Sequence, residues 1–130
     1  MKHKVLVVDD DRLVADTLQM VFLSNGFESE ACYSVGDALR RAKTFDPELM
    51  LCDVTMPGQD GLELAATITR EMPATRVIML TAYLTKAASV QLEALRRRRP
   101  LKLITKPCHP EVLLREVEES LALAPLPVAS

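Results

Sequence analysis

The sequence has no long apolar run, no large excess of charge of either sign and no paired cysteines. Its 16 Lys and Arg residues against 18 Asp and Glu residues leave a formal net charge of −2, so overall charge gives no reason to expect a nucleic-acid partner or binding to an anionic membrane. Because neither a signal peptide nor a stretch long enough to span a bilayer is present, we expect a cytoplasmic protein. Three cysteines without paired spacing favour a reducing compartment.

The chain does contain short apolar runs that end in polar or charged side chains. Such runs are typical of buried parallel strands. In an open α/β sheet the ligand site lies at the carboxyl ends of the strands, so the residues that follow the runs should gather there. These residues are Asp9 with Asp10, Asp53, Thr81 and Lys106.

Between the runs, apolar residues recur at helical spacing, which predicts five strand–helix pairs. We expect strands near residues 4–8, 28–32, 49–53, 76–80 and 101–105, and helices near 13–22, 35–42, 64–72, 84–96 and 110–123. Right-handed crossovers then give a doubly wound, five-stranded parallel sheet in the order 2-1-3-4-5, a flavodoxin-like (βα)5 three-layer sandwich. We assign residues 1–123 to this domain and 124–130 to a C-terminal tail or the start of a linker.

The predicted cluster of carboxylates requires a cation, because each pair repels by about 4 kcal/mol at an effective dielectric constant near 20. A site with oxygen ligands and neither histidine nor thiol suits Mg²⁺ better than Ca²⁺ or Zn²⁺. An aspartate that faces such an ion can act as a nucleophile toward phosphorus. Taken alone, Asp9-Asp10-Asp11 could be only the acidic start of a helix capped by Asp11, and Asp53 only the end of a strand.

Four motifs occur in order along the chain: Val7-Val8-Asp9-Asp10-Asp11, Asp53-Val-Thr-Met-Pro-Gly-Gln-Asp-Gly61, Leu80-Thr81-Ala82 and Lys106-Pro107. With them the sequence resembles the receiver domain of two-component response regulators, from Val5 to about Leu121. Several ordered motifs are a far more specific signal than any one of them.

This resemblance implies a role for each residue of the predicted site. Asp53 would be the phosphoacceptor, while Asp9, Asp10, Asp53 and the backbone carbonyl of Thr55 would bind Mg²⁺ as the cofactor. Thr81 and Lys106 would contact the phosphoryl group, and Lys106-Pro107 would be a cis peptide. The donor would be a histidine kinase or a histidine phosphotransfer protein, and the domain would catalyse only its own phosphorylation and dephosphorylation.

The resemblance also implies a switch. Movement of Thr81 toward the phosphate would repack the face formed by the fourth helix, the fifth strand and the fifth helix, and so control a downstream protein or output domain. A homodimer formed on phosphorylation is a second partner to consider. Leu103 occupies the position in the fifth strand where the family often has an aromatic residue, so any repacking would use a leucine.

Two features near the fourth helix have alternative interpretations. The run Arg96-Arg97-Arg98-Arg99 is favoured as a solvated helix end, with a docking patch for an acidic partner as the alternative. Tyr83, two residues after Thr81, is either a solvent-facing aromatic or, with Thr55, a shield that slows hydrolysis of the acyl phosphate.

Three other functions compete with this interpretation. A haloacid-dehalogenase type phosphatase or phosphotransferase also uses Asp, Mg²⁺, Thr and Lys, but it requires a second Asp where Thr55 stands. A flavin-binding protein of the same topology would need a Ser/Thr/Gly-rich phosphate loop after the first strand, which is missing. A receiver-like interaction module that works without phosphate would have no need for the complete set of site residues.

Overall fold

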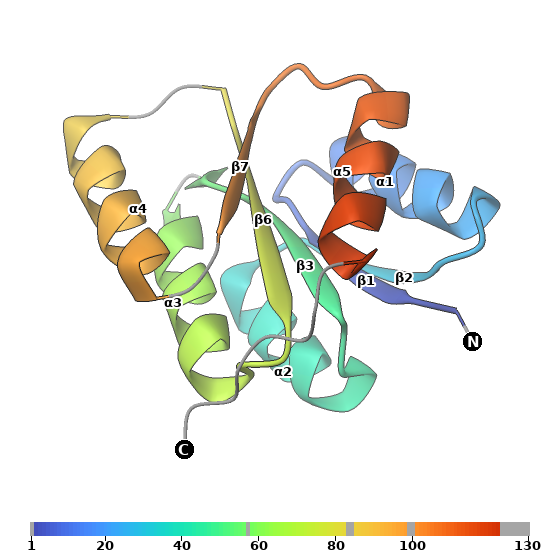
Figure 1. The fold of residues 1–130 in the computed structure, drawn as a ribbon, viewed down its shortest axis with the longest axis horizontal. Coiled ribbons are helices and arrows are strands. Elements are labelled where there is room, and N and C mark those ends of the chain that lie inside the picture. Colours follow the sequence, from blue (N-terminus) through green and yellow to red (C-terminus); the bar gives the residue numbers. More distant parts are fainter. Residues whose placement is uncertain (1, 57, 83–84, 99–100, 123–130) are drawn as a thin grey trace.

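A five-stranded parallel sheet forms the centre of the molecule, described here by a computed structural model for residues 2–56, 58–82, 85–98 and 101–122 (Figure 1). Its strand order is β2-β1-β3-β6-β7, which confirms the predicted doubly wound order once the sheet's strands are counted along the chain. The strands are β1 (Lys4–Val8), β2 (Glu28–Cys32), β3 (Leu49–Asp53), β6 (Arg76–Thr81) and β7 (Lys102–Thr105).

The two strands that are not part of this sheet, β4 (Thr55–Met56) and β5 (Gln59–Asp60), form a small hairpin that the sequence did not predict. They pair antiparallel immediately after β3. Gly58 lies in the turn between them with a φ of 70°, a conformation that favours glycine. Two-residue strands carry no readable alternation of polar and apolar side chains, so we expected only a loop here.

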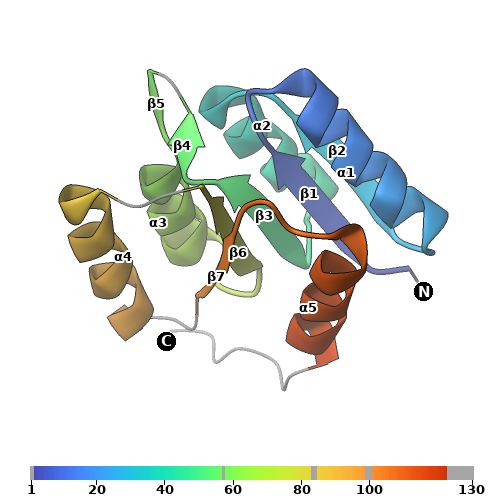
Figure 2. The same cartoon turned by 90° about the horizontal axis from the view of Figure 1, so that it is seen from above.

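Five helices cover the two faces of the sheet and complete the predicted three layers. Helices α1 (Arg12–Ser24) and α5 (Pro110–Ala122) lie on one face, and α2 (Val35–Phe45), α3 (Gly61–Glu71) and α4 (Lys86–Arg98) lie on the other (Figures 1 and 2). The buried apolar residues form two clusters, one under each helical layer. Successive residues of a strand contribute to opposite clusters, as Met50 and Leu51 of β3 do, because side chains alternate across a sheet.

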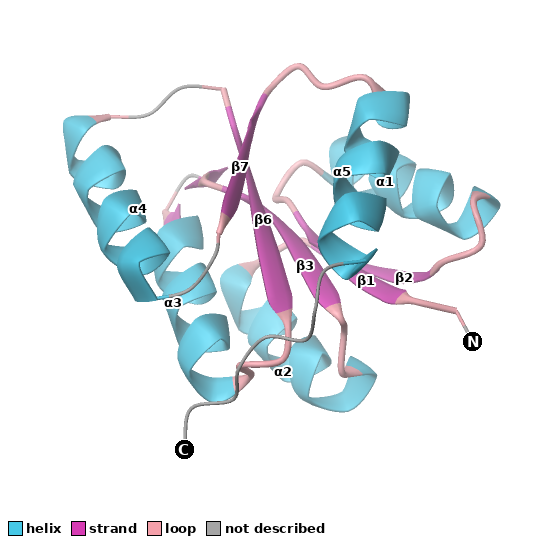
Figure 3. Cartoon of the chain, viewed as in Figure 1, coloured by secondary structure: helices cyan, strands magenta, loops and turns pink. Residues whose placement is uncertain are grey.

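Three of the helices begin close to the carboxyl edge of the sheet (Figure 3), and each of them has a polar capping side chain. The Asp11 carboxylate accepts hydrogen bonds from the first-turn N–H groups of α1, Ser34 does the same for α2, and Asp60 for α3. Each cap satisfies N–H groups that a helix leaves unpaired at its start. The third residue of the aspartate triplet therefore serves the helix, as one of the two sequence interpretations predicted.

No helix within the described ranges is long and apolar enough to cross a bilayer.

Candidate functional site

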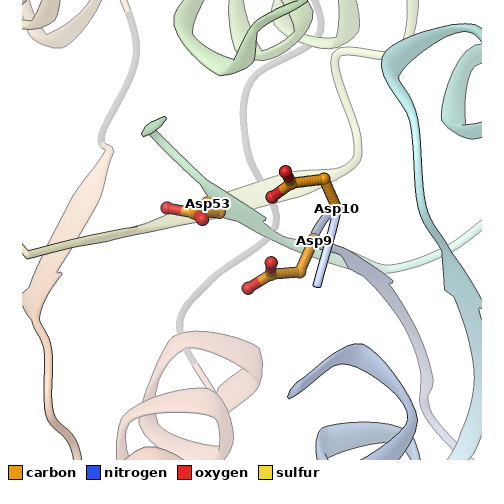
Figure 4. Close-up of side chains that lie close together, drawn as sticks. All are labelled: Asp9, Asp10 and Asp53. Atoms are coloured by element: carbon orange, nitrogen blue, oxygen red, sulfur yellow. The ribbon is translucent and has the colours of Figure 1, made fainter. Parts of the chain in front are cut away.

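Three carboxylates meet at the carboxyl edge of the sheet. Asp9 and Asp10 follow β1, and Asp53 ends the neighbouring strand β3; one carboxylate oxygen from each lies within 4.8 Å of the others (Figure 4). The parallel register, which places Val8 opposite Cys52, brings these two strand ends to the same level. The structure thus brings together the acidic residues that the sequence placed at this edge.

The two inner carboxylates are buried and held by backbone N–H groups. Asp9 is 2% exposed and Asp53 is 6% exposed. The Asp11 N–H donates to Asp9 Oδ1 at 3.0 Å, and the Thr55 N–H donates to Asp53 Oδ1 at 3.1 Å. Asp10 is exposed. The site therefore has two fixed carboxylates at its base and one accessible carboxylate at its rim.

Lys106 supplies a positive charge from the opposite end of the chain. Its Nζ lies 3.3 Å from Asp9 Oδ2 and 3.2 Å from Asp53 Oδ2. The Lys106 N–H also donates to the Thr81 carbonyl at 2.7 Å, which extends the β6–β7 pairing by one residue. The Lys106-Pro107 peptide is cis, as expected. One ammonium group is thus shared between the two buried carboxylates.

Burial and the neighbouring charges act against each other in the electrostatics of the site. Burial raises the pKa of Asp9 above its ordinary value, whereas the Asp11 N–H and the Lys106 charge act to lower it and the Asp53 charge adds to the rise. Burial alone would lower the pKa of Lys106, but the charges of Asp9 and Asp53 outweigh it, so this pKa is raised. Lys106 is therefore charged at neutral pH, and among the described residues it is the cation that forms ion pairs within this cluster, with Asp9 and Asp53.

Thr81 and Thr55 each lie next to the end of β3, one through strand pairing and one along the chain. Thr81 ends β6 and is 3% exposed. Thr55, in the β4–β5 hairpin, is exposed and directs its N–H at Asp53. Thr81 thus ends the strand that pairs with β3, whereas Thr55 lies in the hairpin that follows β3 directly.

Gly61 is a residue whose structural role the sequence did not reveal. A Cβ atom at this position would lie 2.2 Å from the Asp53 carbonyl oxygen and 3.1 Å from that of Val54. Only glycine allows the start of α3 to pass this close to the end of β3. A glycine directly after the capping aspartate of a helix, where helix-forming residues are preferred, was the available signal.

The remaining predicted residues lie away from the carboxylates or outside the described ranges. Leu103 is partly buried and packs against the core cluster under α2, α3 and α4. Arg96 and Arg97 are exposed near the end of α4, and Arg96 pairs with Glu93 at 3.4 Å. Tyr83 and Arg99 lie outside the described residues, so their proposed roles stay predictions.

Comparison with known proteins gives one consistent result. A family model described as the response regulator receiver domain matches residues 5–118. A CheY-like response regulator receiver domain from Methanospirillum hungatei is 28% identical, with a TM-score of 0.83 over 93% of this chain and 94% of that chain. The BeF3-activated DrrB receiver domain is also 28% identical, with a TM-score of 0.76 over 93% and 98% of the two chains. NtrX from Brucella abortus is 26% identical with a TM-score of 0.79, and the match covers 93% of this chain but 27% of that one.

Proposed function

The chain belongs to the family of response regulator receiver domains, and we propose that it receives a phosphoryl group on Asp53 from a histidine kinase or a histidine phosphotransfer protein. Receiver domains are signalling modules and not classical enzymes, so the phosphorylated state itself is the product that matters. The observation that carries the proposal is the Asp53 carboxylate, which is buried at a strand end between a backbone N–H and the Lys106 ammonium. In the transfer the N–P bond to the donor histidine breaks, and an O–P bond to an Asp53 carboxylate oxygen forms.

The residues around Asp53 stabilise charge during this transfer. Lys106 lies against Asp53 Oδ2, where its charge can offset that of the phosphoryl oxygens. The Thr55 N–H holds Oδ1 and so fixes the orientation of the carboxylate. Thr81, at the end of the next strand, has a hydroxyl group that can donate to a phosphoryl oxygen.

The donor set of the site fits Mg²⁺. In the part of the chain that the structure describes, three carboxylates lie within 4.8 Å of one another and two of them share Lys106 as their ion-pair partner, which leaves net negative charge and a set of oxygen ligands. Asp9, Asp10, Asp53 and the backbone carbonyl of Thr55 would hold the ion. When bound, Mg²⁺ supplies positive charge that offsets the charge on the phosphoryl oxygens.

An apolar groove beside the site supports docking of the donor protein. A cavity of about 430 Å³ lies between α1 and the start of α5, with Lys106 in its wall. Its apolar lining includes Val14, Leu18 and Leu113, and the nearby Leu13 side chain is 77% exposed. Exposed apolar surface of this kind marks interaction sites. We assign it to the helix of the donor that carries the phosphohistidine.

The output surface is the face made by α4, β7 and α5. Thr81 and Lys106 are joined through the backbone, so movement of Thr81 toward a phosphoryl group would pull on the end of β7. Leu103 would then repack in place of an aromatic residue. A groove of about 520 Å³ on this face is lined by Leu101 and Leu103, by the cations Arg76, Arg96 and Lys102, and by Glu119. Arg96 and Lys102 are paired with Glu93 and Glu116, so the groove supports a downstream protein or output domain that packs on apolar side chains within a rim of mixed charge. A homodimer through this face is the alternative occupant.

The competing functions receive less support. Position 55, where a haloacid-dehalogenase type enzyme would need its second aspartate, is a threonine that donates its N–H to Asp53. The family match supports a cytoplasmic signalling module over a phosphatase or a flavin-binding protein. In NtrX the match covers 27% of that chain, so a receiver domain can be a minor part of a longer protein. Intact-mass measurement distinguishes a phosphoacceptor from a receiver-like module that works without phosphate.

The test is intact-mass measurement after incubation with acetyl phosphate and Mg²⁺. We expect a single phosphoryl adduct on the wild-type protein and none on Asp53→Asn. Asp46→Asn is the matched control, because Asp46 caps the far end of α2 with a φ of 53°, a conformation that asparagine tolerates; this variant should be phosphorylated normally. An unmodified wild type would favour the phosphate-independent module, and an adduct that persists in Asp53→Asn would place the phosphate on another residue.

A further inference from the structure

Three side chains beside the site form a cluster that the proposed phosphotransfer does not use. Arg12, the first residue of α1, stacks on the ring of Tyr33, with Cζ 4.2 Å from the ring centroid. The Tyr33 hydroxyl donates a hydrogen bond to Asp16 Oδ1. Tyr33 follows β2 directly, so the cluster joins the start of α1 to the neighbouring strand end at the carboxyl edge.

Arg12 follows three aspartates in the sequence, yet its guanidinium lies over an aromatic ring. Arg12 lies two residues after Asp10 and three after Asp9, yet within the described part of the chain it forms no ion pair, and neither does Asp10. The cation of the site is Lys106, from 97 residues further along the chain. A long arginine side chain can reach a carboxylate two residues away, but here the guanidinium is held over the Tyr33 ring.

The Tyr33 ring provides that restraint because it is itself fixed. It packs against the core cluster under α1 and α5, and its hydroxyl is bound by Asp16. The hydrogen bond to Asp16 is the main cause that raises the pKa of Tyr33, so the hydroxyl remains a donor at neutral pH. A cation–π contact of about 0.5–1 kcal/mol is comparable to an exposed ion pair, which is typically about 0–1 kcal/mol. The contact with the ring can therefore compete with an ion pair to Asp10 for the guanidinium.

We propose that Tyr33, held by Asp16, keeps the Arg12 guanidinium out of the carboxylate cluster and thereby leaves Asp10 open to the divalent cation. This inference rests on the proposed function, since it concerns the same metal site. Tyr33 is a positioning residue that acts through Arg12. Without the ring, the guanidinium would be free to pair with the Asp10 carboxylate, for which its planar donor geometry is well suited, and it would then compete with Mg²⁺.

The test is a measurement of Mg²⁺ affinity by isothermal titration calorimetry on the unphosphorylated protein. For Tyr33→Leu we expect about fivefold weaker binding, the order of magnitude of one added unit charge near a divalent ion in partly screened surroundings. Tyr33→Phe keeps the ring but loses the hydrogen bond to Asp16, so its affinity should lie between that of wild type and Tyr33→Leu. In the double variant Tyr33→Leu with Arg12→Ala, affinity should return to nearly the wild-type value.

The double variant separates positioning from a purely structural role. Urea unfolding of all variants checks that they are folded, and the double variant should be no more stable than Tyr33→Leu. Weak binding that persists in the double variant would overturn the inference, as would wild-type affinity in Tyr33→Leu. A wild type that binds no Mg²⁺ would overturn the metal site of the proposed function and this inference with it.

Discussion

Strands β3 and β7 both run toward the site, yet they are packed very differently. Every residue of β3 is buried, and β1 and β6 pair with it on either side. Strand β7 is only partly buried and pairs with β6 alone at the edge of the sheet. The first leads to the proposed phosphoacceptor and the second to Lys106. Regions with fewer buried apolar contacts open and rearrange more easily, so the acceptor lies on the better packed half and the output face on the less packed one.

The largest expected effect compares the same substitution in the two strands. Leu51→Ala removes a side chain that is 1% exposed in β3 and should lower the free energy of unfolding by about 3 kcal/mol. Leu103→Ala in β7 should lower it by about 1 kcal/mol, because a partly buried side chain loses less burial. Urea unfolding measures both. Equal losses would show that β7 is packed as well as β3 and would remove the distinction.

A second substitution tests how tightly the end of β3 is enclosed. Gly61→Ala would place a methyl group against the Asp53 carbonyl, and we expect it to destabilise the protein by about 2 kcal/mol through overpacking. It should also slow acetyl phosphate labelling, because the backbone that carries Asp53 must shift. Gly36→Ala in α2 is the control: its nearest neighbour would be the flexible end of Arg40 at 3.6 Å. That change should leave stability unaltered or raise it by about 0.5 kcal/mol.

The third prediction concerns the buried Asp9 carboxylate, which follows β1 on the better packed side of the sheet. The pKa of Asp9 is raised from its ordinary value of 3.8, chiefly by burial. Protonated Asp9 therefore contributes to the free energy of unfolding in full below about pH 4, and this contribution is lost as pH rises through the folded-state pKa. Without Mg²⁺, Asp9→Asn should therefore raise the free energy of unfolding at pH 7 by on the order of 1 kcal/mol, with little change near pH 3.5. Lys106 keeps Asp53 as a partner in this variant. Urea unfolding at both pH values is the measurement, and a loss of stability at pH 7 would show that the Asp9–Lys106 pair outweighs burial.

The smallest effect is expected at the end of α4. Replacing both Arg96 and Arg97 with glutamine should change the free energy of unfolding by less than about 0.5 kcal/mol, since both are exposed. Acetyl phosphate labelling of Asp53 should be unchanged. Weaker binding to an identified output partner would assign these arginines to the docking surface, and unchanged binding would assign them to a solvated helix end.

Much of the fold was predictable because its signals are local. Continuous apolar runs mark parallel strands, and Ser34 and Asp11 mark helix starts through their own side chains. The β4–β5 hairpin was not predicted, because its strands have two residues each and pair only with one another. The close approach of Gly61 to Asp53 was missed for a related reason: it depends on where two elements cross, which no single segment records.

By itself, the sequence determined which side chains would end the strands, and therefore that Asp9, Asp10, Asp53, Thr81 and Lys106 would share one edge. Strand direction and the alternation of strands and helices require this, whatever the detailed packing. Only the tertiary structure decided which of the charged side chains there pair with one another. It paired Lys106 with Asp9 and Asp53 while Arg12, far closer to the acidic residues in sequence, stacked on Tyr33. The reason is that charges and rings interact through distances in space, and those distances exist only once the strands lie side by side.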